Sequence, residues 1–251
     1  MKPAPFLAGA YLLPERVPEE RRYPFELPVV RDLRLEFESA VTIFVGENGS
    51  GKSTVLQALA VLSRLPAAGG GRDQLSARPR TAADLSTALA GAMRPSFRRR
   101  PRHAWFFRAD MHDHFAAELA ARGGHHALGR DPDALFADRR LETLSHGEGF
   151  LATVNNRARE GLLLFDEPES ALSPQRQLTL LALLARAVSE GSTQIVMATH
   201  SPILMTFPGA QLLSFDGERI EPIHLEETSH YQLTRDILEC PERYWKHLIE
   251  S

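Results

Sequence analysis

The sequence predicts an α/β fold with a mostly parallel core sheet, preceded by an antiparallel β lobe and interrupted by an inserted helical subdomain. Three short apolar runs, at residues 41–45, 161–166 and 194–199, are typical of buried strands. Helical patterns lie between these runs, and strands that alternate with helices pair in parallel. The first 45 residues instead hold many prolines, which oppose long helices and central strands. Short antiparallel strands are therefore expected there.

Size and composition indicate one domain, residues 1–251, with the helical insertion between about residues 64 and 160. An apolar content of 43% and a charged content of 24% are typical of soluble globular proteins, and a net charge of −3 gives no support for binding nucleic acid or membrane through overall charge. No apolar run reaches the roughly 18–20 residues that cross a bilayer. The first residues lack the apolar core of a signal peptide, and the single Cys240 suits a reducing compartment. We expect a cytoplasmic protein.

In the first segment, short strands are expected at residues 6–13, 25–30 and 33–37, and in the last of these Leu33, Leu35 and Phe37 alternate with Arg34 and Glu36. After them comes a glycine-rich stretch that fits the phosphate-loop pattern, and that lies between the strand at 41–45 and a helical pattern at 54–62. Its members are Gly46, Glu47, Asn48, Gly49, Ser50, Gly51, Lys52, Ser53 and Thr54.

The glycines of this stretch allow a tight turn whose N–H groups face a polyphosphate, and the helix N-terminus adds partial positive charge. Lys52 is expected to contact the β- and γ-phosphates, and the Ser53 hydroxyl to hold magnesium. The alternative is a flexible turn that happens to precede a helix. The strand before it and the helix after it favour the phosphate loop.

The region between about residues 64 and 143 is less distinct. Residues 67–71 suggest a loop, 82–93 and 114–122 have helical patterns, and 103–108 predict a strand. Five arginines lie close together, and they could bind a phosphate backbone. A solvated loop is the favoured interpretation, because the net charge is negative. The five are Arg94, Arg98, Arg99, Arg100 and Arg102.

Two later strands end in residues suited to phosphate chemistry. Asp166 closes the strand at 161–166, where it can reach magnesium, and Glu167 can polarise a water for attack on a γ-phosphate. His200 follows the strand at 194–199 and could hydrogen-bond the γ-phosphate. The alternatives are two solvated acids and a structural histidine. The nearby phosphate loop favours the catalytic interpretation.

The remaining elements are a helix and a hairpin. Ser173 and Pro174 predict a helix start, with Leu178, Leu181 and Leu184 on one face. Asp216 and Gly217 predict the turn of a hairpin between residues 212–215 and 219–225, and two short helices separated by Pro241 end the chain.

A fourth motif, Leu144-Ser145-His146-Gly147-Glu148, is weak alone because it could simply cap a helix. With the phosphate loop, the Asp166-Glu167-Pro168 strand end and His200 in that order, the chain resembles the ATP-binding-cassette superfamily of ATPases over roughly residues 25–225. It looks most similar to the soluble predicted-ATPase and chromosome-maintenance-like branches.

This resemblance implies an ATPase that uses ATP and magnesium and forms a head-to-tail homodimer around two ATP molecules. Each site would take its phosphate loop from one copy and Ser145, His146 and Gly147 from the other, with residues 170–173 crossing the dimer. In this superfamily an aromatic residue upstream of the loop often stacks on adenine. Phe25 and Tyr23 are the candidates, although either could equally be a packing residue.

The chain departs from the family pattern at three positions. Ser173 stands where an aspartate is usual, and His146 replaces a signature glycine. The glutamine expected after the strand at 103–108 is absent, and Asp110 could serve magnesium or water instead. In transporters that region couples the ATPase to membrane segments, so the absence of the glutamine makes a transporter subunit the less favoured interpretation.

Three functions therefore compete. The favoured one is a soluble ATP-hydrolysing switch whose ATP-dependent dimer acts on DNA or a protein partner. The alternative is the nucleotide-binding subunit of a membrane transporter, which needs a membrane partner. A non-hydrolysing scaffold is disfavoured because Lys52, Asp166, Glu167 and His200 are all present.

Overall fold

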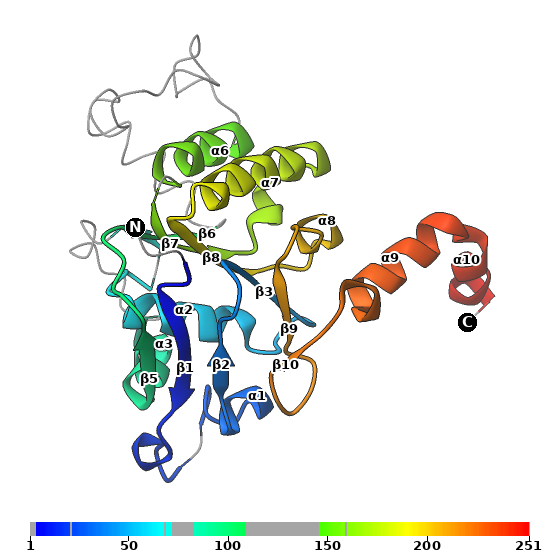
Figure 1. The fold of residues 1–251 in the computed structure, drawn as a ribbon. Coiled ribbons are helices and arrows are strands. Elements are labelled where there is room, and N and C mark those ends of the chain that lie inside the picture. Colours follow the sequence, from blue (N-terminus) through cyan, green and yellow to red (C-terminus); the bar gives the residue numbers. More distant parts are fainter. Residues whose placement is uncertain are drawn as a thin grey trace.

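The computed structural model describes residues 4–20, 22–67, 69–71, 83–108, 146–158 and 160–250. They form two sheets, one of seven strands in the order β10-β9-β3-β8-β7-β6-β4 and one of three strands in the order β2-β1-β5 (Figure 1). The predicted helix at 114–122, and with it the middle of the predicted helical subdomain, lies outside these residues.

The core sheet has five parallel strands at its centre and a short antiparallel strand at each edge. The mostly parallel sheet predicted from the sequence is therefore confirmed. Residues 67–71, expected as a loop, contribute the edge strand β4. The parallel strands are β9 (Gln211–Ser214), β3 (Val41–Val45), β8 (Thr193–Ala198), β7 (Gly161–Asp166) and β6 (Ala104–Arg108), and the edges are β10 (Glu221–Pro222) and β4 (Gly70–Gly71).

The second sheet is the expected antiparallel lobe. It consists of β2 (Arg34–Glu36), β1 (Leu7–Leu12) and β5 (Met93–Phe97). The strand predicted at residues 25–30 is wrong: a turn holds Phe25, and helix α1 (Pro28–Arg31) follows. Pro28 occupies the first turn of α1, where its missing N–H costs nothing and its fixed φ favours the helix.

Helices cover both faces of the core sheet (Figure 1). On one face, α2 (Lys52–Leu62), α3 (Ala83–Ala92) and the lobe pack against alternate strand residues such as Phe44 and Leu164. On the other face, α6 (His146–Arg157), α7 (Pro174–Ser189) and α8 (Pro202–Met205) pack against Ile43, Leu163 and Phe165. Successive strand residues point to opposite faces, so apolar runs are needed throughout.

Helix α7 buries a different stripe from the one predicted. Leu184 is fully buried as expected, but Leu178 is 57% exposed, and the neighbour of Leu184 on the buried face is Leu180. The stripe continues through Gln177 and Ala187, which are too polar or too small to mark it in the sequence. Pro174 begins the helix as predicted, although the side chain of Ser173 makes no capping hydrogen bond.

A buried amide joins the lobe to the core sheet. Gln194 on β8 is fully buried, and its Oε1 accepts hydrogen bonds from the backbone N–H groups of Phe6 (2.8 Å) and Leu7 (2.9 Å). Its Nε2 donates to the carbonyl of Leu7 at 2.9 Å. One side chain therefore pairs three backbone groups that are otherwise hidden from water.

Two of the crowded arginines lie against aromatic rings of the lobe. The guanidinium carbon of Arg99 is 4.9 Å from the ring centre of Phe6, and that of Arg100 is 5.1 Å from the ring centre of Phe97. Cation–π contacts of this kind cover the lobe's aromatic side chains. They give part of the cluster a structural use.

The chain ends in two helices that project from the body, α9 (Ser229–Glu239) and α10 (Pro241–Glu250) (Figure 1). They meet at Pro241, as predicted, and expose Leu233, Leu238, Trp245 and Ile249. Within the described part of the chain, no helix has the length and apolar character to span a membrane. Short 3₁₀ helices complete the structure: η1 (Pro14–Arg16), η5 (Pro168–Ala171) and η6 (Leu225–Glu227).

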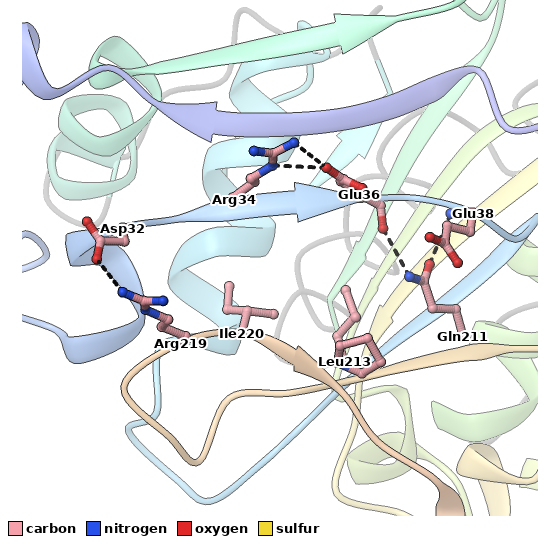
Figure 2. Close-up of a pocket in the computed structure, with 9 residues that line it drawn as sticks. Asp32, Arg34, Glu36, Glu38, Gln211, Leu213, Arg219 and Ile220 are labelled. Carbon is pink, nitrogen blue, oxygen red and sulfur yellow. Dashed lines mark hydrogen bonds and ion pairs between the residues drawn. The ribbon is translucent and has the colours of Figure 1, made fainter.

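A pocket of about 430 Å³ lies between β2 and the hairpin of β9 and β10 (Figure 2). Both of its arginines are paired with carboxylates: Arg34 with Glu36 at 2.7 Å, and Arg219 with Asp32 at 3.6 Å. Gln211 Nε2 donates to the carbonyl of Glu36. Because these groups already have partners, the pocket shows little that would recognise a polyphosphate.

Candidate active site

All five parallel strands of the core sheet end at the same edge, and each end brings a polar group there. In open α/β sheets this is the edge at which ligands bind. The residues at or just beyond these ends are Gly46, Arg108, Asp166, Glu167, His200 and Asp216.

The glycine-rich turn leads from β3 into α2 through backbone conformations that favour glycine. Gly46 has φ +145° and Gly51, at the N-cap of α2, has φ +102°. A Cβ on Gly46 would lie 2.8 Å from Oδ1 of Asp216, so a side chain there would collide. The predicted strand, turn and helix are confirmed, and the first turn of α2 presents the unpaired N–H groups that a helix start always has.

Asp216 fixes the start of this turn, a role that the sequence did not suggest. Its Oδ1 accepts a hydrogen bond of 2.6 Å from the backbone N–H of Glu47. The predicted hairpin is confirmed in shorter form, and Asp216 is part of its turn as expected. Only the parallel pairing of β9 with β3 shows that this turn lies beside the glycine loop.

Lys52 is 3% exposed and lies inside the loop. Its Nζ donates to the carbonyls of Gly46 (2.6 Å) and Glu47 (2.8 Å) and to Oγ of Ser50 (3.4 Å). Burial lowers the pKa of Lys52, while the carboxylates of Glu167, Asp216 and Asp166 oppose that shift. The ammonium group is therefore held inside the glycine turn by its carbonyls and the Ser50 hydroxyl.

Ser53 and Asp166 come together from residues far apart in the sequence. Ser53 Oγ donates a hydrogen bond of 2.7 Å to Oδ1 of Asp166. A hydroxyl and a carboxylate oxygen are hard donors of the kind that Mg²⁺ binds in nucleotide sites, so this pair fits the metal expected from the sequence. Asp110, the other metal candidate, lies outside the described residues.

Arg108 is a second site residue that the sequence did not suggest. Its Nε lies 4.0 Å from Oδ2 of Asp166, and its Nη1 donates to the carbonyl of Ala67 at 3.4 Å. The register of β6 against β7 places Arg108 directly opposite Asp166. A strand-end arginine carries no motif, so only the strand order could reveal it.

Glu167 has an unusual backbone for a residue with a side chain, with φ +48°. A left-handed conformation at a residue other than glycine costs on the order of 1 kcal/mol and is concentrated at functional sites. Its N–H donates to the carbonyl of Ala198 at 2.9 Å, which ties it to β8. The conformation leaves the carboxylate 44% exposed at the strand-end edge.

His200 faces Glu167. The His200 Nε2 atom lies 3.6 Å from Oε1 of Glu167, and the His200 backbone N–H donates to Oε1 of Glu169 at 2.6 Å. Burial lowers the pKa of His200, and the charge of Lys52 acts in the same direction, so the ring is neutral at pH 7. Burial raises the pKa of Glu169.

His200 Nδ1 lies 2.9 Å from Nε2 of His230, a partner that no motif indicated.

The described part of the signature motif, from His146 on, begins helix α6 on the other face of the sheet. Ser145 is outside the described residues, and α6 begins at His146. Gly147 is buried, and a Cβ there would lie 2.8 Å from the carbonyl oxygen of Ala171, so this helix start packs against η5. Glu148 pairs with Arg176 of α7 at 3.4 Å. Within one chain, α6 and the phosphate-loop helix α2 are on opposite faces.

The aromatic candidate for the base changes. Phe25 is 6% exposed and packs in the lobe's core, which contradicts the stacking role suggested for it. Tyr23 is 42% exposed, and its hydroxyl is hydrogen-bonded to Oγ1 of Thr54 at the start of α2. Between the two predicted aromatics, Tyr23 is the one with a face available to a ligand.

Two family profiles match the chain. One, described as "AAA domain, putative AbiEii toxin, Type IV TA system", matches residues 134–206, and another, described as "AAA domain", matches residues 24–64. The second match covers the glycine turn, and the first covers the strand ends with Asp166 and His200.

Curated relatives and solved structures agree with these profiles. The hemin import ATP-binding protein HmuV of Rhodopseudomonas palustris is 30% identical in strain BisB5, over 85% of this chain and 80% of the relative. In strain BisA53 it is 33% identical over 66% of this chain and 64% of the relative, so the chain spans just under two thirds of that protein. A solved SmcHead bound to the C-winged helix domain of ScpA has a TM-score of 0.53 at 13% identity, over 89% of this chain and 99% of that one, which shows a shared fold.

Proposed function

The chain belongs to the ATP-binding-cassette superfamily and is an ATPase. From this premise we propose that it is a soluble, cytoplasmic switch. Two copies of the chain would close around two ATP molecules and act on DNA or a protein partner. The contact between Ser53 and Asp166 at 2.7 Å carries the proposal, because it unites the phosphate loop with the acidic strand end. Two motifs separated by more than one hundred residues thus form a single site.

Each strand-end residue has a distinct task in this proposal. The N–H groups of the glycine turn bind phosphate oxygens, and Lys52 exchanges its carbonyl partners for the β- and γ-phosphates. Ser53 and Asp166 hold magnesium, which supplies charge neutralisation when bound. Glu167 orients and polarises the attacking water, and His200 donates to the γ-phosphate. Tyr23 stacks on the base.

The dimer is inferred from the placement of α6. Its first described residues, His146 and Gly147, begin a helix on the face opposite α2, so this helix start cannot close over the phosphate loop of its own chain without rearrangement. A second copy in head-to-tail orientation would bring its own Ser145, His146 and Gly147 to the γ-phosphate. ATP then forms part of the interface, so binding favours the closed pair and hydrolysis releases it.

A membrane transporter subunit is the alternative. The hemin import relatives support it, because their names place them in import systems. Against it, the residues after β6 contain no glutamine as far as Gln175, and that glutamine region is what couples a transporter ATPase to its membrane partner. Co-purification of an integral membrane protein with the tagged chain would favour the alternative, whereas turnover stimulated by double-stranded DNA would favour the switch.

The variant Glu167→Gln tests the proposal directly. It keeps the side chain's size but cannot accept a proton from water, so we expect turnover to fall by about 100-fold or more while ATP binding persists. Light scattering with ATP and magnesium should then show a stable dimer, and removal of ATP should return the monomer.

Glu190→Gln is the matched control, because Glu190 is an exposed residue at the end of α7. It should hydrolyse ATP as the wild type does and show no trapped dimer. A Glu167→Gln variant that binds ATP but stays monomeric would contradict the dimer, and one with wild-type turnover would contradict the role of Glu167.

A further inference from the structure

The first turn of α9 contacts the strand-end site. Thr228 caps the helix, with its Oγ1 accepting from the N–H of Tyr231 at 3.3 Å, and His230 follows two residues later. His230 Nε2 lies 2.9 Å from His200 Nδ1, and the two ring centres are 5.0 Å apart. Ser229 Oγ lies 3.5 Å from Oε1 of Glu47 in the glycine turn. The helix start therefore contacts both the loop and the histidine.

The surroundings of the histidine pair decide which nitrogen carries each proton. The far side of the His200 ring, Nε2, faces the carboxylate of Glu167 at 3.6 Å. A bare nitrogen lone pair beside a carboxylate is repelled, whereas an N–H is attracted, so a neutral His200 places its proton on Nε2. Nδ1 is then an acceptor, and the hydrogen bond requires His230 to donate from its own Nε2.

The other ring nitrogen of His230 fits this arrangement. His230 Nδ1 lies 3.4 Å from Oγ of Ser229, and the single hydrogen of that hydroxyl can be donated either to His230 Nδ1 or to Oε1 of Glu47 at 3.5 Å. In this arrangement it is donated to His230. The hydrogen bonds then run in one direction, from Ser229 through His230 to Nδ1 of His200, and the Nε2–H of His200 faces Glu167 at 3.6 Å without a hydrogen bond to it. The reverse direction would leave His200 Nε2 without a hydrogen, facing both Glu167 and the phosphates.

We propose that His230 is a positioning residue for ATP hydrolysis, which holds the His200 ring in place and keeps its proton on Nε2, the atom that faces Glu167 and the γ-phosphate. This inference rests on the role of His200 in the proposed function. Partners of a catalytic imidazole's second nitrogen fix tautomer and ring orientation in the same way elsewhere. It makes the start of the projecting arm α9–α10 part of the active site.

Three variants test the proposal through steady-state ATP hydrolysis. His230→Phe keeps a ring but removes the donor, and we expect the kcat to fall by about 10- to 100-fold with the KM for ATP within about twofold, because phosphate binding by the glycine turn is untouched. His230→Gln retains an N–H donor and should recover most of the kcat. His103→Phe, at an exposed histidine before β6, is the control and should match the wild type.

Nitrogen-15 NMR of the histidine rings gives a readout that does not depend on turnover. The wild type should show His200 with hydrogen on Nε2, and His230→Phe should show a mixture of the two neutral forms. Unchanged kcat and an unchanged tautomer in His230→Phe would overturn the proposal, as would a His230→Gln variant as slow as the Phe variant. A wild type without turnover would count against the proposed function instead, and the tautomer would still test His230.

Discussion

The two faces of the core sheet carry different sequence motifs. The face covered by α2, α3 and the lobe belongs to the glycine turn, whose Lys52 and Ser53 already have partners within the chain. The face covered by α6, α7 and α8 holds the helix that begins at His146, and its N-terminal turn packs against η5. Within one chain, the glycine turn and the acidic strand end are therefore already joined. On the second face, the start of α6 is the part that the proposed dimer would use.

The largest effect is expected from a variant of the glycine turn on the first face. Lys52→Ala removes the buried ammonium that the loop carbonyls hold, and with it the positive charge offered to the β- and γ-phosphates. We expect phosphate release to fall by at least about 100-fold, as when one preorganised stabilising group is deleted from an active site. Lys246→Ala, on exposed α10, is the control and should be unchanged. Turnover above one tenth of wild type in Lys52→Ala would show that the phosphates are bound by other residues.

Mixing two inactive variants sharpens the comparison between the faces. Lys52→Ala disables the phosphate loop, and Ser145→Arg should prevent the signature motif from reaching ATP. Neither homodimer should therefore hydrolyse ATP. In an equimolar mixture, half of the dimers are mixed and each keeps one of its two sites intact, so about a quarter of wild-type turnover should return. No recovery, in a mixture that light scattering shows to exchange subunits, would mean that each chain completes its own site.

A smaller effect tests how the lobe is held on the first face. Gln194→Leu is similar in size but leaves the N–H groups of Phe6 and Leu7 and the carbonyl of Leu7 unpaired. We expect the free energy of unfolding in urea to drop by at least about 3 kcal/mol, because three buried groups lose their partner and each costs about 1–3 kcal/mol. Gln175→Leu, on the exposed side of α7, should change it by less than about 0.5 kcal/mol. Equal effects of the two would show that the amide does not join lobe to core.

The smallest expected effect is the pH dependence of stability caused by His200, at the strand-end edge of the sheet. The pKa of His200 is lowered by burial and by the charge of Lys52. As the pH falls, His200 is therefore protonated in the unfolded chain before it is protonated in the folded chain. Stability should therefore fall as the pH drops below about 6.5 towards the lowered pKa. His200→Gln should lose this part of the pH dependence in urea titrations at pH 7 and pH 5.5. His103→Gln, an exposed control, should retain it, and a His200→Gln profile identical to wild type would contradict the assignment.

The sequence was most reliable where the signal is local. The glycine turn, the strand at 161–166 with its acidic end, and the start of α7 at Pro174 are all found as expected. It was wrong for residues 25–30, where the many prolines of the segment suggested a short strand and Pro28 started a helix instead. It also misplaced the stripe of α7, because Gln177 and Ala187 lie on the buried face beside Leu180 and Leu184.

Asp216, Arg108 and His230 could not have been found from the sequence. Each is an ordinary polar residue without a motif, and each reaches the site only because particular strands or helices lie side by side. Asp216 depends on the pairing of β9 with β3, Arg108 on the register of β6 with β7, and His230 on the contact of α9 with the end of β8.

The sequence by itself determined the chemistry of this protein: a glycine turn between a strand and a helix, and acids and a histidine at strand ends, are specified by residues close together in the chain. The tertiary structure decided which of these groups meet, since strand order and register bring Ser53 to Asp166 and Glu167 to His200. It also decided that α2 and α6 cover opposite faces. The physical reason is that hydrogen bonding and packing between distant segments depend on the whole fold, whereas turns and strand ends depend mainly on local sequence.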